Sequence, residues 1–145
     1  MDSFDSKRER SYTHETANLR AWDANAAYWD DSLGDGGNDL FEQLILPSIH
    51  RLVGHLEAGC RILDLGTGNG MIARALAVDD VTVVATDYSR NLLKRAQARA
   101  DASGKAIQFR QLDLMSDEAM NGFAQTISHD ERCAIVSSVR RARLT

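Results

Sequence analysis

The chain has 145 residues, 43% of them hydrophobic and 26% charged, and a formal net charge of −4 at pH 7. This composition is typical of one soluble globular domain, and without an excess of Lys and Arg it argues against a nucleic-acid partner. The two cysteines lack metal-ligand spacing, so we expect neither a disulfide framework nor a metal site. No secretory segment or bilayer-length apolar run occurs in the sequence, which predicts no membrane partner and a cytoplasmic location.

The N-terminal third of the chain is predicted to be a disordered segment followed by helices. Residues 1–12 are polar and densely charged, so we expect them to be disordered. Residues 13–57 are predicted to form the helices that precede the first strand. Between residues 13 and 31, apolar side chains recur at steps of three or four and predict one helix face: Leu19, Trp22, Ala26 and Trp29. The simplest interpretation is an amphipathic helix whose tryptophans cover the core.

A glycine-rich turn and a proline shape the next predicted helix. Gly34, Gly36 and Gly37 predict a flexible joint, after which Asn38 is placed to cap a helix. Pro47 is the only proline, and because it removes an intrahelical hydrogen bond we expect it to kink or divide this helix. The apolar face of the helix is predicted from its hydrophobic positions: Leu40, Leu44, Ile45, Ile49, Leu52, Val53 and Leu56.

The stretch 61–70, RILDLGTGNG, combines an apolar run with closely spaced glycines. The run is typical of a buried strand in a parallel sheet, and good helix formers follow from Met71 onward. The glycines therefore occupy a strand-to-helix turn at the carboxyl end of a strand, where open α/β sheets bind ligands. Their spacing is G-x-G-x-G, which departs from the G-x-G-x-x-G fingerprint of dinucleotide sites. A tight turn without a ligand is the alternative at this point.

Two further apolar runs each end in an aspartate. The run 81–86 ends in Asp87, whose carboxylate would be placed to accept hydrogen bonds from ribose hydroxyls. Ser89 is predicted to cap a helix with an apolar stripe, and the run 107–112 ends in Asp113. The stripe consists of Leu92, Leu93, Ala96 and Ala100. Taken singly, either aspartate is a solvated loop acid or a helix cap, but two such acids after a glycine turn favour a ligand site.

The segments LDLGTGNG, VVATDYS and FRQLDL resemble, in order and spacing, the first three motifs of class I S-adenosylmethionine-dependent methyltransferases. The resemblance covers roughly residues 40–113. It implies an α/β, Rossmann-like methyltransferase fold, a parallel sheet with helices on both faces and strand order 3-2-1-4. It also implies S-adenosyl-L-methionine as cofactor, and a small-molecule O, N or C nucleophile as methyl acceptor.

The resemblance further implies which residues bind the cofactor: Asp64, Gly66, Gly68, Gly70, Asp87, Tyr88, Asp113 and Leu114. Asp64 and the glycine loop would face the methionine part, with Asp64 near its amino group. Asp87 would hold the ribose hydroxyls and Tyr88 would lie beside the adenine, which Asp113 and the Leu114 N–H would also approach. In this family the segment before the first strand often forms a lid, and here Tyr28 and Trp29 would be its contact residues.

The C-terminal part is predicted to complete a cofactor-binding core over residues 58–139. Ser116 would cap a helix reaching residue 128, residues 133–139 would form a fourth strand, and residues 140–145 would be a solvated basic tail. The buried side of that helix is predicted to consist of Ala119, Met120, Phe123 and Ile127. A complete sheet of this family has further strands, so we expect a C-terminally shortened chain with an exposed strand edge that favours self-association.

No catalytic base is assigned from the sequence, and His129 is only a conceivable candidate. Two alternatives to the methyltransferase remain open. One is a fragment of a dinucleotide-binding oxidoreductase, which would use Asp87 on the adenosine ribose, and the other is a non-catalytic methyltransferase remnant that acts as a binding or interaction protein.

Overall fold

The computed structural model describes residue 17 and the ranges 19–127 and 133–137. The predicted disorder of residues 1–12, the candidate base His129 and the predicted basic tail 140–145 lie outside these ranges. Within them, no helix combines the length and the apolarity needed to cross a bilayer.

The sheet has four parallel strands in the order β3-β2-β1-β4. The strands are β1 (Arg61–Leu65), β2 (Thr82–Asp87), β3 (Ile107–Gln111) and β4 (Cys133–Ser137). Leu65 pairs with Thr86 on one side and with Ser137 on the other, so the strands end at the same edge of the sheet. The predicted strand order is confirmed, and the carboxyl ends meet where the glycine turn begins.

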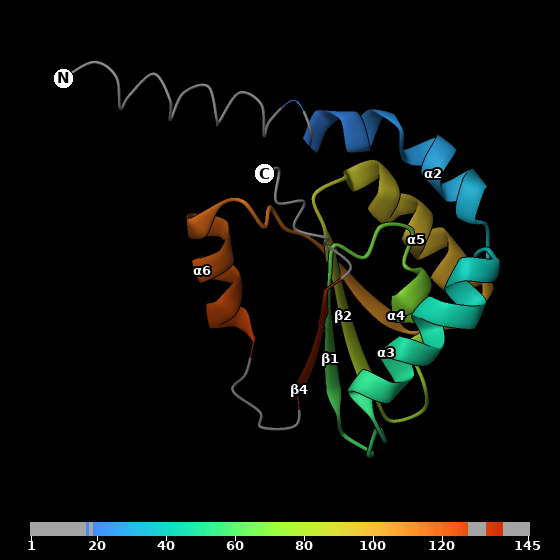
Figure 1. Cartoon of the computed structure of the whole chain (residues 1–145). Helices are drawn as coiled ribbons and strands as arrows, with labels where there is room; N and C mark the ends of the chain where they lie inside the picture. Colours follow the sequence, from blue (N-terminus) through green and yellow to red (C-terminus); the bar gives the residue numbers. More distant parts are fainter. Residues whose placement is uncertain (1–16, 18, 128–132, 138–145) are drawn as a thin grey trace, which may run out of the picture.

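Helices flank both faces of this sheet, as predicted. The structure contains α2 (Ala26–Leu33), a π-helical turn η1 (Phe41–Ile45), α3 (Leu46–Val53), α4 (Met71–Leu76), α5 (Arg90–Ala102) and α6 (Asp117–Thr126). In Figure 1, α3, α4 and α5 lie together on one side of the strands and α6 stands on the other. The predicted caps are confirmed, because Ser89 Oγ accepts from Leu92 N and Ser116 Oγ accepts from Ala119 N, both at 3.1 Å.

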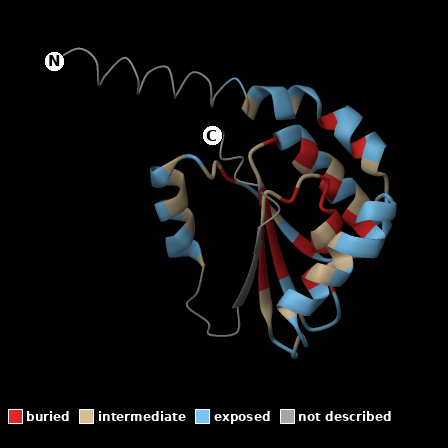
Figure 2. Ribbon diagram, in the orientation of Figure 1, coloured by how far each residue is buried: buried red, intermediate tan, exposed pale blue. Residues whose placement is uncertain are grey.

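The core lies between the sheet and the helices α3, α4 and α5, where buried residues concentrate in Figure 2. It consists of Ile49, Ile62, Ala73, Leu76, Ala77, Val83, Ala85, Ala100 and Ile107. By contrast, α6 contains no fully buried residue, so the predicted buried side of this helix is only half-buried. Among the described residues α6 is alone on its side of the sheet, and its apolar side chains therefore stay in partial contact with solvent.

The helix over residues 39–53 differs from the prediction in the face that it buries. Asn38 caps it by accepting from Phe41 N at 3.0 Å, and the helix changes from the π turn η1 to α3 one residue before Pro47, where we expected a kink or a division. Leu40, Leu44 and Leu52, however, are exposed, and the predicted apolar face is wrong at these positions. A π turn adds one residue to the helical repeat and rotates the residues after it by about 100°. The buried positions are instead Phe41 and Ile49, with half-buried Ile45 and Val53.

Candidate functional site

The turn between β1 and α4 is fixed by backbone hydrogen bonds to β2. The N–H groups of Gly66 and Thr67 both donate to the Thr86 carbonyl, at 2.8 Å each. Gly68 has a φ of +58°, and a Cβ at this position would meet nothing within 4 Å, so its backbone faces open space. A ligand can therefore lie directly against this glycine.

Asp87 at the tip of β2 connects the second strand to this turn. Its Oδ2 accepts from Gly68 N at 2.8 Å and its Oδ1 accepts from Ser89 N at 2.9 Å. Burial raises the pKa of Asp87 above its ordinary value, although these backbone hydrogen bonds oppose the shift. Each carboxylate oxygen has further acceptor capacity, which can receive a ligand hydroxyl.

A cavity of about 520 Å³ lies in front of these groups, and we call it the first cavity. Its walls are mostly apolar: Leu19, Trp22, Gly66, Gly68, Asp87, Tyr88, Leu92, Leu112, Leu114 and Met115. The structure thus brings together Gly66, Gly68, Asp87, Tyr88 and Leu114 from the predicted cofactor site. Asp87 is the only acidic residue, and no Lys or Arg occurs, among the described residues that line it.

The other predicted site residues lie outside this lining. Asp64 is fully buried, and its Oδ2 accepts from Thr67 Oγ1 at 2.7 Å. Gly70 begins α4 with a φ of +76°, and a Cβ there would lie 3.0 Å from that of Ala96. Asp113 Oδ1 accepts from Met115 N at 2.9 Å. Gly70 therefore has a packing role, which permits close approach of α4 and α5, whereas Asp64 and Asp113 contact their own loops.

Sequence reasoning missed the apolar walls of the first cavity. Leu112 and Met115 flank Asp113, and Leu92 lies at the start of α5, but nothing local distinguishes them from core residues. Leu19 and Trp22 belong to the predicted N-terminal apolar face, and their lining position supports the lid interpretation of that segment. Of the two predicted lid contacts, Trp29 lines a neighbouring cavity, whereas Tyr28 is exposed and lines neither.

The N-terminal helical segment is attached at one end by Asp23. This residue lies in the helical stretch 19–24, which a turn at Asn25 separates from α2. Asp23 Oδ1 accepts from Ser89 Oγ at 2.6 Å and from Asn91 N at 3.1 Å, at the start of α5. The hydrogen bond from Ser89, followed by that from Asn91, holds the pKa of Asp23 below its ordinary value. The segment is thereby fixed next to Asp87 and the first cavity.

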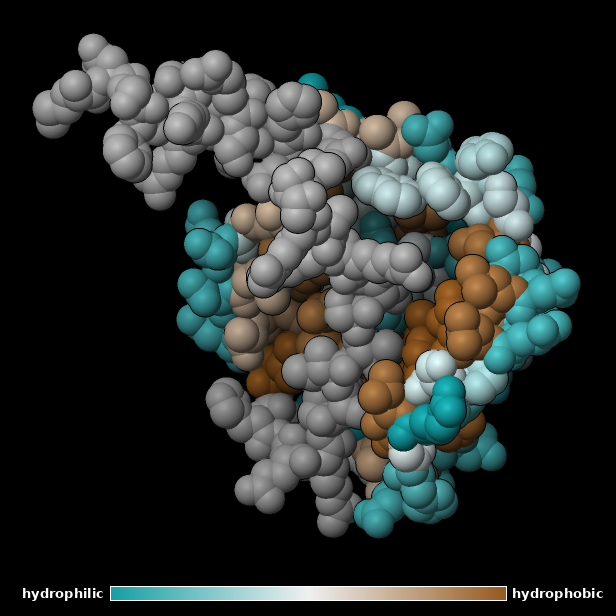
Figure 3. Space-filling view, in the orientation of Figure 1, coloured by the Kyte–Doolittle hydropathy of each residue, from teal (hydrophilic) through white to brown (hydrophobic). Residues whose placement is uncertain are grey.

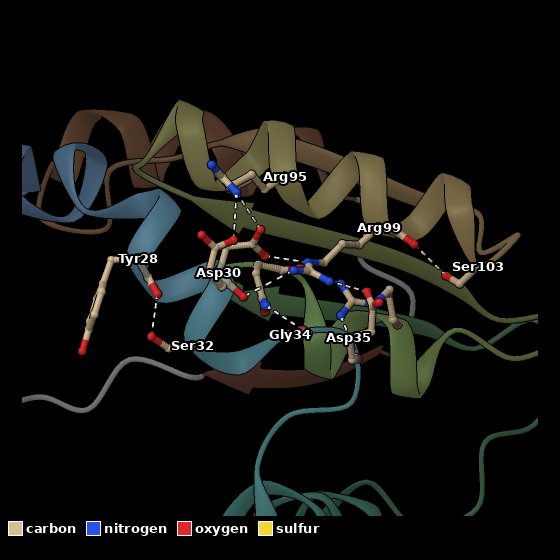
Figure 4. A network of polar contacts seen from close by, with 11 residues as sticks. Tyr28, Asp30, Ser32, Gly34, Asp35, Arg95, Arg99 and Ser103 are labelled. Atoms are coloured by element: carbon tan, nitrogen blue, oxygen red, sulfur yellow. Dashed lines mark hydrogen bonds and ion pairs between the residues drawn. The ribbon is translucent and has the colours of Figure 1, made fainter.

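A second attachment joins α2 to the middle of α5 through Asp30 (Figure 4). Asp30 Oδ1 accepts from Arg99 Nε at 2.6 Å, and Oδ2 accepts from Arg95 Nη1 at 3.0 Å. Burial raises the pKa of Asp30, but the hydrogen bonds from both arginines outweigh it, so the pKa lies below its ordinary value. We call this set of ion pairs the Asp30 clamp. Its sequence signal is the i, i+4 spacing of two arginines on one face of α5.

The glycine-rich turn after α2, predicted to be a flexible joint, makes hydrogen bonds and an ion pair with other parts of the fold. The Gly34 carbonyl accepts from Asn69 Nδ2 at 3.3 Å, and the Asp35 carbonyl accepts from Arg74 Nη2 at 3.3 Å. The Asp35 carboxylate also pairs with Arg99, as Figure 4 shows. The turn is therefore connected to the glycine loop, to α4 and to α5.

A second cavity of about 640 Å³ adjoins the first. The two share Trp22, Gly66, Gly68 and Leu92 in their linings. The remaining wall of the second cavity comes from α2, from η1 and α3, and from the glycine loop with the start of α4. The glycine loop thus separates two adjoining spaces, each large enough for a small molecule.

A family model described as a methyltransferase domain matches residues 62–142. The chain belongs to this family. The match assigns the strand–turn–helix unit and Asp87 to a methyltransferase domain rather than to a dinucleotide-binding oxidoreductase, and it confirms the resemblance seen in the three sequence motifs.

Individual relatives agree with this assignment. A Geobacillus sp. (strain WCH70) protein named as a methyltransferase is 32% identical over 98 residues, covering 67% of this chain and 39% of its own length. The release factor glutamine methyltransferase of Escherichia coli (strain K12) is 41% identical over 76 residues, which cover 50% of this chain and 27% of that protein. The ubiquinone biosynthesis O-methyltransferase of Actinobacillus pleuropneumoniae is 29% identical over 112 residues, which cover 77% of this chain and 46% of that protein. This chain thus spans less than half the length of each.

Among solved structures, TrmN from Thermus thermophilus is similar over 48% of this chain and 22% of its own. The sequence identity is 33% and the TM-score is 0.44.

The first cavity fits S-adenosylmethionine, the cofactor of this family. A flat adenine suits the apolar walls, and an uncharged ribose suits a single carboxylate acceptor such as Asp87. The methionine end can lie directly against the backbone at Gly66 and Gly68, which have no side chains to block it. The absence of Lys and Arg from the described lining suits a ligand without phosphates. The volume is also within the usual range for small-molecule sites.

Proposed function

We propose that this chain is the cofactor-binding part of a methyltransferase that acts on a small-molecule O, N or C nucleophile. The observation that carries the proposal is the place of Asp87, at the tip of β2, hydrogen-bonded to Gly68 N and lining the first cavity. In this position its carboxylate would receive the ribose hydroxyls, while Tyr88 and the Leu114 backbone would flank the adenine.

A small-molecule acceptor is supported by the second cavity, which opens directly beside the glycine loop. When bound, S-adenosylmethionine supplies an electrophilic methyl group on a positively charged sulfur. The contribution of this chain would be to hold the acceptor near that group. No acidic or basic side chain lines the second cavity among the described residues, so this part of the chain would act through proximity and alignment.

Calorimetric titration with S-adenosylmethionine, its demethylated product S-adenosylhomocysteine, and NAD tests the proposal. We expect the first two ligands to bind and NAD not to bind. Binding of NAD alone would refute the proposal, and binding of none of them would favour the non-catalytic remnant.

The Asp87→Ala variant localises the site. Loss of a charged acceptor for ligand hydroxyls costs about 1.5–3 kcal/mol, so we expect affinity to fall by about tenfold or more. Asp79→Ala is the matched control, because it removes the same charge from an exposed position before β2. Circular dichroism of both variants checks that they fold. Unchanged affinity in folded Asp87→Ala would remove this residue from the site. The same titration of Asp113→Ala tests the adenine contact that the resemblance implies.

A further inference from the structure

We infer that the second cavity binds an uncharged, predominantly apolar small molecule, with a ring that packs against tryptophan, as the methyl acceptor. This inference rests on the proposed function and specifies the chemical class of the acceptor. Carboxylates, phosphates, sulfonates and other charged acceptors are excluded from this class.

The walls of the second cavity are apolar on three sides. Trp29 and Leu33 come from α2, and Met71 and Ile72 come from the start of α4. The third side is formed by η1, α3 and the residue before them: Leu40, Phe41, Leu44, Ile45 and Ile49. Figure 3 shows hydrophobic side chains gathered over η1 and α3 on the visible face. Leu44 is 57% exposed, and an apolar ligand would cover such a side chain.

The polar side chains in this wall already have partners within the protein. Asn38 accepts from Phe41 N, Ser48 Oγ donates to the Leu44 carbonyl, and Asn69 donates to the Gly34 carbonyl. Thr67 Oγ1 donates to Asp64. A charged ligand would lose hydration here without gaining an opposite charge from the described lining, whereas an apolar ligand has little hydration to lose.

The tryptophans give the cavity its shape preference. The rings of Trp22 and Trp29 lie 5.1 Å apart between centroids, tilted by 35°, and both line the second cavity. The two rings pack against each other, and the parts of them that line the cavity offer aromatic surface against which a flat ring can pack. Trp22 also lines the first cavity, so a ring packed beside it would lie next to the bound cofactor.

The transfer forms one bond and breaks another, and it uses no side chain of the described lining as an acid or base. A lone pair of the acceptor's hydroxyl oxygen or amine nitrogen forms the bond to the methyl carbon. The bond from that carbon to sulfur breaks, and its electron pair stays on the sulfur. The proton of the acceptor passes to water.

The test compares two probes that share a ring system, neutral 2-naphthol and anionic 2-naphthalenesulfonate. Each is titrated calorimetrically into the full chain, with and without saturating S-adenosylhomocysteine. We expect 2-naphthol to bind at least about tenfold more tightly than the sulfonate, because the described lining holds no cation. Equal affinities, or tighter binding of the sulfonate, would overturn the inference.

Two variants of the same helical segment then locate the probe. Leu44→Glu places a charge in the wall of the second cavity, whereas Leu52→Glu places the same charge on a side chain that is 86% exposed and lines neither cavity. Leu44→Glu should weaken 2-naphthol binding by about tenfold or more and Leu52→Glu by less than about twofold. Equal effects would refute the location.

S-adenosylhomocysteine affinity separates this inference from the proposed function. It should be unchanged in both variants, since neither position lines the first cavity. If S-adenosylhomocysteine fails to bind to the unaltered chain, the proposed function fails. If it binds while 2-naphthol does not, the inference about the acceptor fails alone.

Discussion

The Asp30 clamp predicts that one carboxylate determines how firmly the N-terminal helical segment is attached to α5. Asp30→Asn weakens two charge-assisted hydrogen bonds, each worth about 1.5–3 kcal/mol. The hydrogen bond from Arg95 contributes less than this, because the Arg95 side chain is 38% exposed and water screens its charge. The Asp30 side chain, by contrast, is only 5% exposed. Arg99 keeps its contacts with Asp35 and with the Asp30 carbonyl. We therefore expect a loss of about 2–3 kcal/mol in the free energy that holds the segment in place.

The neighbouring residue provides the control. Asp31 lies 3.6 Å from Arg95 Nη1, but its side chain is 75% exposed, so Asp31→Asn should cost less than about 0.5 kcal/mol. Urea titration followed by tryptophan fluorescence reports on this segment, because both tryptophans, Trp22 and Trp29, lie in it. Far-ultraviolet circular dichroism reports on the whole chain. In Asp30→Asn the fluorescence transition should occur at a lower urea concentration than the circular dichroism transition. If Asp30→Asn and Asp31→Asn unfold at the same urea concentrations, the role of the clamp is refuted.

The direction of the pH effect follows from the lowered pKa of Asp30. A carboxylate with a lowered folded-state pKa contributes stability above its unfolded value, here 3.8, and loses it as the pH falls through the folded value. The loss of stability caused by Asp30→Asn should therefore reach its full size at neutral pH. It should shrink when the pH is lowered below about 3.8.

Two further predictions concern the cofactor site and its glycine loop. Because burial raises the pKa of Asp87 above the ordinary carboxyl value of 3.8, S-adenosylhomocysteine binding should already weaken at a pH above that value as the solution is acidified, while Asp87→Asn should show weak binding without this dependence. A pH profile shared by both proteins would contradict the assignment. Gly70→Ala should destabilise the fold by about 2–4 kcal/mol, since a Cβ would combine a φ of +76° with a 3.0 Å approach to Ala96. Gly104→Ala, with a φ of +67° and open space, should cost only about 1–2 kcal/mol, and equal losses in denaturant titrations would argue against the packing role of Gly70.

Much of the fold follows from local patterns in the sequence. Short β-branched and apolar runs give the strands, and the hydroxyls of Ser89 and Ser116 cap the helices that the sequence predicts. These signals act within three or four residues, so they survive without knowledge of the rest of the chain. The resemblance then adds the strand order, which the pairing of β1 with both β2 and β4 confirms.

The candidate site was only partly predictable for the same reason. Asp87 and Gly68 could be singled out because an acid and a glycine follow successive strands. Asp113 fits the same pattern but lies outside the lining of the first cavity, although its neighbours Leu112 and Leu114 line it. A pattern of strand ends predicts which residues come to one edge of the sheet. It does not predict which side chains turn into the cavity, because that depends on the path of the chain after each strand end.

The sequence by itself determined the strand–turn–helix units, their caps and the family to which the chain belongs, because these depend on short-range hydrogen bonding, backbone freedom and motif spacing. Tertiary structure decided which side of the 39–53 helix is buried, and it joined Asp30 to Arg95 and Arg99 across more than 60 positions of chain. It also turned Leu44 toward a cavity instead of the core. Burial and charge pairing depend on neighbours brought together by folding; the local spacing of Arg95 and Arg99 places them on one helix face but does not identify Asp30 as their partner.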